Sequence, residues 1–387
     1  MDTTVSFVGI GGYAATILRE IFDSSKKGYT ILSAVDPYAS KSPCYPEICE
    51  REIPVYASLD EMYAHEKTYP ELVVITTPIQ FHTEQILCAL KHGSNVLCEK
   101  PLTGDKEDIE KIEEEQRRTG KFVAVGYQWS YSRAIQKLKA DVLSGIFGKP
   151  IFFKSLVFWP RDKAYFRRST GWAGKIYASN GKKICDSIVN NATAHYIHNI
   201  LYILGKSTDA AMHASAIKGT LLRVNDIQTF DTATIRFNME NGAKGLFVVS
   251  HSTQKTVEPE FEYLFEHAKI VYSEKTKNIY ASMSDGRVFN YGDPFADGAA
   301  YKFFCCLDAI QNKTPVPCGV EAAKEQVYFV DELHAGNRVC DVRRDKVKEI
   351  DNFLVVEGLD KMLLDCYEQN KLLEELSTFE EIVDLRS

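Results

Sequence analysis

A lysine follows a stretch of sequence that reads as a buried strand. Residues 96–98 are apolar, and Glu99, Lys100 and Pro101 come directly after them. A short continuous apolar run is typical of a parallel strand covered on both faces, and ligands of open α/β sheets bind just outside the carboxyl ends of such strands. Pro101 favours an extended backbone at Lys100, which would present the lysine side chain to a ligand. The alternative is a solvated Lys-Pro turn at the surface.

A second group of polar residues lies at 186–199. Within it, Asn191, His195 and His198 are four and three residues apart, a spacing that places them on one face of a helix. Three interpretations stay open for this face: a catalytic base, histidines satisfied within a core, and a metal site. No acid or cysteine joins the stripe, so we expect no metal. Imidazole suits a base because its unperturbed pKa is about 6.5.

A glycine-rich turn near the N-terminus has the spacing of a dinucleotide-binding loop. Residues 5–8 are strand-like, and the turn that follows has the form G-x-G-x-x-A, with Gly9, Gly11, Gly12, Tyr13 and Ala14. The glycines allow a tight turn and close approach to a pyrophosphate, which would bind at the N-terminus of the next helix. The alternative is a tight strand-to-helix turn without a ligand.

Asp36 supports the dinucleotide interpretation. It ends a second strand-like run at 30–35, about where such loops expect an acid to bind the adenosine ribose hydroxyls. A carboxylate at this position repels a 2′-phosphate. The sequence therefore predicts NAD as the cofactor, with NADP disfavoured.

Strand and helix patterns continue to alternate through the first third of the chain. Strands are expected at 72–75, 96–98 and 122–125, and helices at 82–92 and 107–119. This alternation predicts a Rossmann domain with a doubly wound parallel sheet over residues 1–127. One edge of that sheet would carry Gly11, Thr76, Thr77, Lys100 and Gln128.

The pattern changes after Gln128. Strands at 232–239 and 246–249 alternate about Asn241-Gly242, a strong hairpin signal, and further strand patterns follow without intervening helices. We expect residues 128–387 to form a substrate-binding α+β domain with a large, mainly antiparallel sheet. Later helices are predicted at 303–310, 321–333 and 359–376.

Composition limits the partners. The chain has 387 residues and a formal net charge of −7, which argues against a surface built for nucleic acid or anionic lipid. No apolar run is long enough to span a bilayer. The N-terminus has no basic region or cleavage site, and none of the ten cysteines forms a Cys-x-x-Cys pair, so we expect a cytoplasmic protein with reduced thiols that acts on a small molecule.

Four motifs in this order, GIGGYA, VITTP-x-x-x-H, NVLCEKP and VGYQ, resemble those of the Gfo/Idh/MocA oxidoreductase family, which includes inositol and sugar dehydrogenases. The resemblance implies that Lys100 lies beside the nicotinamide and holds or protonates the reacting oxygen. It also implies that Pro78, His82 and Glu99 shape the cofactor cleft. In this family the sheet of the second domain often forms a dimer interface, which implies a homo-oligomer, a dimer or tetramer, through the C-terminal sheet.

The chain departs from the family at one position. The family motif D-x-x-x-H aligns with Asn191 and His195, so an amide replaces the aspartate. A neutral amide donates or accepts hydrogen bonds but cannot carry the proton. Trp172 and the basic residues Arg161, Lys163, Arg167 and Arg168 precede this motif. They are either solvated surface or contacts for an anionic or polyhydroxylated substrate.

These observations predict an NAD-dependent oxidoreductase acting on a secondary alcohol or ketone of a sugar, inositol or related polyol. The expected substrate contacts come from Lys100, Trp172, Asn191, His195 and His198. Two alternatives use the same fold: an NAD-dependent glycoside hydrolase that oxidises its substrate transiently, and a sensor that binds the dinucleotide without catalysis.

Overall fold

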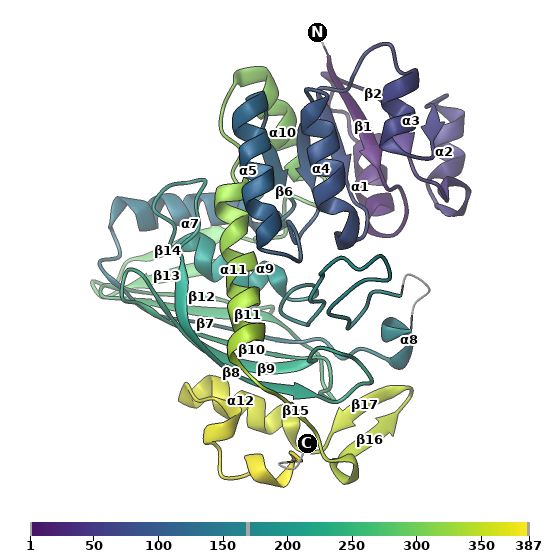
Figure 1. The fold of residues 1–387 in the computed structure, drawn as a ribbon. Helices are drawn as coiled ribbons and strands as arrows, with labels where there is room; N and C mark the ends of the chain where they lie inside the picture. Colours follow the sequence, from purple (N-terminus) through teal and green to yellow (C-terminus); the bar gives the residue numbers. More distant parts are fainter. Residues whose placement is uncertain (1, 168–170, 385–387) are drawn as a thin grey trace. The chain divides into compact units, whose positions relative to one another are not determined.

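The structure, a computed structural model, describes residues 2–167 and 171–384 and divides into two compact units (Figure 1). The first unit contains residues 1–133 and 295–324, and the second contains residues 134–294 and 325–387. The sequence predicted a single division after residue 127. The units differ from that division because the chain returns to the first unit at residue 295.

The first unit is built on a six-stranded parallel sheet with strand order β3-β2-β1-β4-β5-β6. The strands are β1 (Thr3–Val8), β2 (Tyr29–Val35), β3 (Val55–Tyr56), β4 (Leu72–Ile75), β5 (Asn95–Cys98) and β6 (Val123–Val125). The helices between and after them are α1 (Tyr13–Phe22), α2 (Tyr45–Glu50), α3 (Leu59–His65), α4 (His82–Lys91), α5 (Glu107–Thr119) and α6 (Gln128–Tyr131). The predicted doubly wound parallel sheet is confirmed.

Helix α10 (Tyr301–Asn312) completes the core of this unit from far along the chain. Phe303 packs against Phe7 of β1, with ring centres 5.9 Å apart, and against Tyr29 of β2 at 5.3 Å. The sequence predicted a helix here, but placed it in the second domain. Helical periodicity shows which face of a helix is apolar without showing which sheet that face covers.

The second unit contains a nine-stranded sheet with strand order β14-β13-β12-β11-β7-β10-β9-β8-β15. Its strands are β7 (Pro150–Phe158), β8 (Ala214–Arg223), β9 (Thr232–Met239), β10 (Lys244–Ser250), β11 (Val257–Phe265), β12 (Ala268–Tyr272), β13 (Ile279–Met283), β14 (Val288–Gly292) and β15 (Val339–Asp341). All neighbours are antiparallel except the pairs β7/β10 and β8/β15. The predicted hairpin is β9/β10, and Gly242 in its turn has φ +85°.

Helices cover one face of this sheet. They are α9 (Ala194–Ile203) and α11 (Val320–Gly336), the latter belonging to this unit from residue 325. Asn199 of α9 donates a hydrogen bond to the Tyr263 hydroxyl of β11 at 2.8 Å. Phe329 of α11 packs against Phe237 of β9, with ring centres 5.0 Å apart. Helices α7 (Arg133–Ser144) and α8 (Lys163–Phe166) flank β7 in the sequence.

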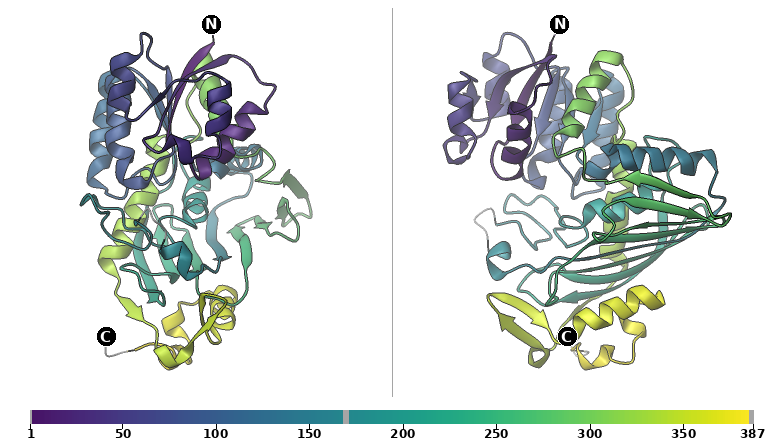
Figure 2. Two further views of the ribbon diagram at one scale, coloured as in Figure 1. Left: turned by 90° about the vertical axis from the view of Figure 1, so that its right-hand side faces the viewer. Right: turned by 180° about the vertical axis from the view of Figure 1, so that it is seen from behind.

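The C-terminal segment covers the opposite face of β7, β8 and β10, as Figure 2 shows from two sides. It consists of the hairpin β16 (Val347–Ile350) and β17 (Phe353–Val356), helix α12 (Leu359–Gln369) and the turns that follow. α12 is shorter than predicted because Asn370 adopts a left-handed conformation, with φ +56°, and ends it. Over these strands this face of the sheet is therefore covered by the chain itself.

In the part of the chain that the structure describes, no helix is long and apolar enough to cross a membrane. No disulfide links the cysteines of the described residues.

Candidate active site

The glycine turn between β1 and α1 leaves room for a phosphate. Gly9 has φ +82°, and a Cβ there would lie 3.1 Å from Thr77 Cγ2, so this position requires glycine. At Gly11 and Gly12, by contrast, a Cβ would meet no atom within 4 Å. α1 begins at Tyr13 without a side-chain cap and with no acidic residue in its first turn. Its N–H groups and positive dipole end therefore fit the pyrophosphate of a dinucleotide.

Two side chains hold this turn against the neighbouring strands. Asp36, directly after β2, accepts hydrogen bonds from the Ile10 N–H at 3.0 Å and from the Tyr38 N–H at 2.8 Å, one on each carboxylate oxygen. Thr76, directly after β4, donates from its hydroxyl to the Gly9 carbonyl at 2.6 Å. Ala14 is buried in the first turn of α1, where its small side chain lets the helix lie close to the sheet.

Glu99 forms a buried ion pair at the end of β5. The Lys302 ammonium, on α10, lies 2.5 Å from Glu99 Oε1, and the lysine side chain is only 1% exposed. Burial opposes the charged form of Lys302, but Glu99 and Tyr13 outweigh burial and raise the pKa of the lysine. Gly126, after β6, lies so close that a Cβ would stand 2.8 Å from Glu99 Oε1. Glu99 is therefore fixed by three elements of the sheet edge.

Tyr13 and Gln128 lie beside this ion pair. The Lys302 ammonium is 4.9 Å from the centre of the Tyr13 ring, and the Tyr13 hydroxyl donates to Gln128 Oε1 at 3.4 Å. The glycine turn, the end of β5 and the start of α6 thus share one cluster. Of the predicted cofactor residues, Gly9, Asp36, Thr76, Glu99 and Gln128 come to this edge through contacts that the structure describes.

His82 has a different environment from the one predicted. Its side chain is buried, and its two ring nitrogens lie 2.9 Å from the Pro101 carbonyl oxygen and 2.8 Å from the Thr77 carbonyl oxygen. Burial lowers the pKa of this imidazole. His82 therefore ties the segment after β4 to the segment after β5, and it would act on the cofactor edge by holding Lys100 in place. Thr77 donates to Gln85 at 2.5 Å, and Pro78 precedes a single helical turn at Ile79–Phe81.

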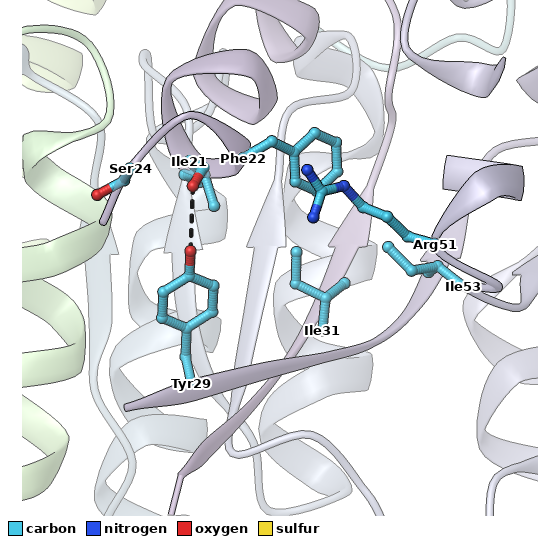
Figure 3. A pocket seen from close by; sticks show the side chains of 7 residues that line it. All are labelled: Ile21, Phe22, Ser24, Tyr29, Ile31, Arg51 and Ile53. Atoms are coloured by element: carbon cyan, nitrogen blue, oxygen red, sulfur yellow. Dashed lines mark hydrogen bonds between the residues drawn. The ribbon is translucent and has the colours of Figure 1, made fainter. Parts of the chain in front are cut away.

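A cavity of about 430 Å³ in the first unit lies away from this edge (Figure 3). It includes Tyr29 and Ile31, at the amino end of β2, whereas Asp36 follows the carboxyl end of the same strand. The Arg51 guanidinium carbon lies 4.3 Å from the centre of the Phe22 ring, and Arg51 also pairs with Glu47 at 2.8 Å. The cavity is thus separate from the dinucleotide edge.

In the second unit, the predicted helical stripe is wrong at its first position. α9 begins at Ala194, so Asn191 lies in the turn before the helix and is not one helical turn from His195. The Asn191 amide nitrogen donates to Asp186 Oδ1 at 2.9 Å, and Asp186 Oδ2 accepts from the Gly174 N–H at 2.6 Å. The sequence reasoning missed this buried carboxylate as the partner of Asn191, although it lies only five residues away. The amide oxygen is the atom through which Asn191 can accept a hydrogen bond.

His195 and His198 have contrasting surroundings on α9. His195 is half-buried in the first turn, 6.3 Å from the Tyr196 ring between ring centres. His198 is 1% exposed and stacks on Tyr202 at 5.6 Å. Burial lowers the pKa of His198 to about 3, and the charge of Lys139 adds to the effect. His198 has the burial of a core histidine, which does not favour the predicted contact with substrate.

Trp172 and the basic residues that precede the Asn191 motif differ in exposure and pairing. Trp172 is half-buried, and Lys163 forms an ion pair with Glu349 at 2.5 Å. Arg167 is exposed, and Arg168 lies outside the described residues. No group of three His, Cys, Asp or Glu side chains within residues 2–167 and 171–384 could hold a metal ion.

The parallel sheet, the open glycine turn and the acid after β2 define the first unit as a dinucleotide-binding Rossmann unit. Residues 3–127 match the model of the oxidoreductase family with an NAD-binding Rossmann fold, Gfo/Idh/MocA. This part of the chain is similar to that family, in agreement with the motifs, and the matching model describes an NAD-binding Rossmann fold.

Curated relatives match over part of their length. An inositol 2-dehydrogenase from Leifsonia xyli subsp. xyli is 31% identical over 160 residues, 40% of this chain and 46% of the relative. A 2,7-anhydro-N-acetylneuraminate hydratase from Mediterraneibacter gnavus is 26% identical over 153 residues, 39% of each chain. The chain thus spans less than half the length of these relatives.

Solved structures share the fold over most of the chain. An oxidoreductase from Agrobacterium radiobacter, in complex with NAD+, L-tartaric acid and magnesium, has a TM-score of 0.70 and covers 87% of this chain and 98% of its own. Its sequence identity is 17%, so the likeness concerns the fold. The prediction of a Rossmann unit together with a large, mainly antiparallel sheet is confirmed.

Proposed function

We propose that this protein is an NAD-dependent dehydrogenase that acts on a secondary alcohol of a sugar, inositol or related polyol. The observation that carries the proposal is the sheet edge of the first unit, where the open glycine turn follows β1, Asp36 follows β2, and Glu99 and Lys100 follow β5. The name of the inositol 2-dehydrogenase among its relatives supports the substrate class.

The protein would supply position and proton transfer. Bound NAD would supply a hydride acceptor. The N–H groups at the start of α1 would hold the pyrophosphate, and Asp36 would accept from the ribose hydroxyls. Lys100, directly after β5, would donate a hydrogen bond to the reacting oxygen.

In the second unit, His195 would accept the proton of the substrate hydroxyl as a neutral imidazole. Asn191 would orient a substrate hydroxyl or the imidazole through its amide oxygen, because its nitrogen is engaged by Asp186. Asp186 is thus a positioning residue, and it compensates in part for the aspartate that the family motif has at position 191. Trp172 would contribute apolar contact to the sugar.

A second candidate is a reaction without net oxidation, such as transient oxidation during glycoside hydrolysis. It is favoured by the relative that is named a hydratase, an activity that changes no overall oxidation state. A third, a sensor without catalysis, accords with the amide at Asn191.

The test is a panel of polyols, inositols and aldoses assayed for NADH absorbance with added NAD. A dehydrogenase produces stoichiometric NADH with at least one member, and Lys100→Met slows NADH formation by roughly 10²- to 10⁴-fold. Turnover of an aryl glycoside without net NADH would favour the second candidate. Tight NAD binding with neither activity would favour the sensor.

A further inference from the structure

Arg161 carries a charge that the described residues do not neutralise. It lies three residues after β7, and its guanidinium carbon is 4.9 Å from the centre of the Tyr165 ring and 6.0 Å from that of Trp159. The side chain is half-buried, and its Nε is buried without a hydrogen-bond partner. Within the described part of the chain no carboxylate forms an ion pair with it. A partly desolvated donor without an acceptor is unfavourable unless a ligand supplies one.

The neighbouring charged groups are engaged elsewhere. Asp162 accepts from the Tyr165 N–H at 2.8 Å and so caps α8. Lys163 pairs with Glu349 of β16. Glu258 of β11 accepts the indole N–H of Trp159 at 3.1 Å. Arg161 therefore differs from Lys163, which is paired, and from Arg167, which is exposed.

The backbone holds Arg161 in place. The Trp159 N–H donates to the Ser250 carbonyl at 2.9 Å, and the Arg161 N–H donates to the His251 carbonyl at 3.0 Å. The His251 ring, only 3% exposed, returns a hydrogen bond to the Trp159 carbonyl at 2.7 Å. Both β7 and β10 thus fix the position from which the guanidinium projects, as a preorganised binding group requires.

A series of ring contacts connects this position to the proposed base. The Trp159 ring lies edge-on to Tyr196, with centres 5.6 Å apart, and Tyr196 is next to His195 on α9. The Trp159 ring thus lies next to both the Arg161 guanidinium and the helix that carries His195.

We propose that Arg161 binds an anionic group of the substrate, a carboxylate or a phosphate, while His195 acts on a hydroxyl of the same molecule. The proposal rests on the proposed function and narrows its substrate class to acidic or phosphorylated sugars and polyols. The planar guanidinium can donate hydrogen bonds to two oxygens of either group.

The test is calorimetric titration of the full chain, saturated with NADH, with three probes that share a sugar ring: D-glucuronate, D-glucose 6-phosphate and neutral D-glucose. At least one anionic probe should bind more than tenfold tighter than D-glucose, and its identity distinguishes carboxylate from phosphate. That preference should fall at least tenfold in Arg161→Met and less in Arg161→Lys. Arg167→Met, which removes the same charge from an exposed site six residues away, should keep it.

The proposal is wrong if no anionic probe binds, if D-glucose binds as tightly, or if the preference survives Arg161→Met. Should Arg161→Met fail to fold, Arg161→Lys still decides, because it keeps the positive charge and loses the planar guanidinium, so its affinity for the anionic probe must fall below that of the wild type. NADH formation from neutral polyols with no preference for anionic probes would overturn the proposed role of Arg161 and support the proposed dehydrogenase function. Anion binding that depends on Arg161, without hydride transfer from any substrate, would support the role of Arg161 and overturn the dehydrogenase function.

Discussion

The ion pair between Glu99 and Lys302 should be essential to the first unit, and replacing Lys302 with methionine tests this. Methionine keeps most of the length of the lysine and removes its charge. At the observed separation of 2.5 Å, Coulomb's law with an effective dielectric constant of about 20 gives about 7 kcal/mol of attraction. Desolvation of the two ions offsets part of this, and the loss of one partner of such a pair costs about 3–5 kcal/mol.

The design compares Lys302→Met, Glu99→Gln and the double variant. Glu99→Gln leaves the lysine ammonium buried without its anion, and Lys302→Met leaves a carboxylate that is 12% exposed without its cation. The double variant holds no uncompensated charge, so it should recover at least about 2 kcal/mol relative to the sum of the single effects. Urea denaturation gives the free energy of unfolding, and NAD titration shows whether the sheet edge keeps its shape. Additive effects of the two substitutions on stability would refute the reasoning.

Four further predictions concern the cofactor, the chemistry and acid stability. Asp36 should make NAD bind at least about tenfold tighter than NADP, a difference of about 1.4 kcal/mol. Equal affinities for the two dinucleotides in calorimetric titrations would show that Asp36 does not bind the ribose. Lys100→Met should retain NAD affinity while its chemical step slows by roughly 10²- to 10⁴-fold; normal turnover in a stopped-flow assay would make Lys100 a surface residue. Asn191→Asp should lower the melting temperature, because it sets two carboxylates 2.9 Å apart. Exchanging the two residues, as Asp186→Asn with Asn191→Asp, should restore the melting temperature and should move the rise of the reaction rate with pH, which His195→Ala abolishes, to higher pH. If that rise stays at the same pH, the charge at 191 does not reach the imidazole. Burial lowers the pKa of His198 to about 3, so the folded protein keeps this imidazole neutral while the unfolded chain binds a proton below its pKa of about 6.5. The free energy of unfolding should therefore fall by about 2 kcal/mol from pH 7.5 to pH 5. Denaturation curves of His198→Phe should lack this part of the loss, and an equal change of the free energy of unfolding with pH in both proteins would contradict it.

The sequence predicted the edge of the parallel sheet well because its signals are local. Gly9, Asp36 and Glu99 each follow directly after a short apolar strand, and parallel strands bring their carboxyl ends together. Asp36 and Glu99 do lie at that edge. The motif that contains His82 gives only its distance along the chain, whereas its contacts with two carbonyl oxygens follow from the structure.

The partners of the site residues were harder to predict. Lys302 is about 200 residues from Glu99 in the sequence, and a lone lysine in an apolar helix gives no sign of which strand it faces. Asp186 was visible, but the assumption that Asn191 continued the helix hid their contact. His195 and His198 look alike in a periodic pattern, and only burial separates the half-exposed ring from the core ring.

The return of the chain to the first unit has a consequence for biosynthesis. The contact between Phe7 and Phe303 closes a loop of about 300 residues, so the ribosome must complete most of the second unit before α10 can cover β1 and β2. Until then the apolar surface of β1 that α10 buries stays open, and the Glu99 carboxylate has no cation. Domains of this kind cannot fold strictly in order from the N-terminus. The dinucleotide edge therefore matures only after translation has passed residue 312, the last residue of α10.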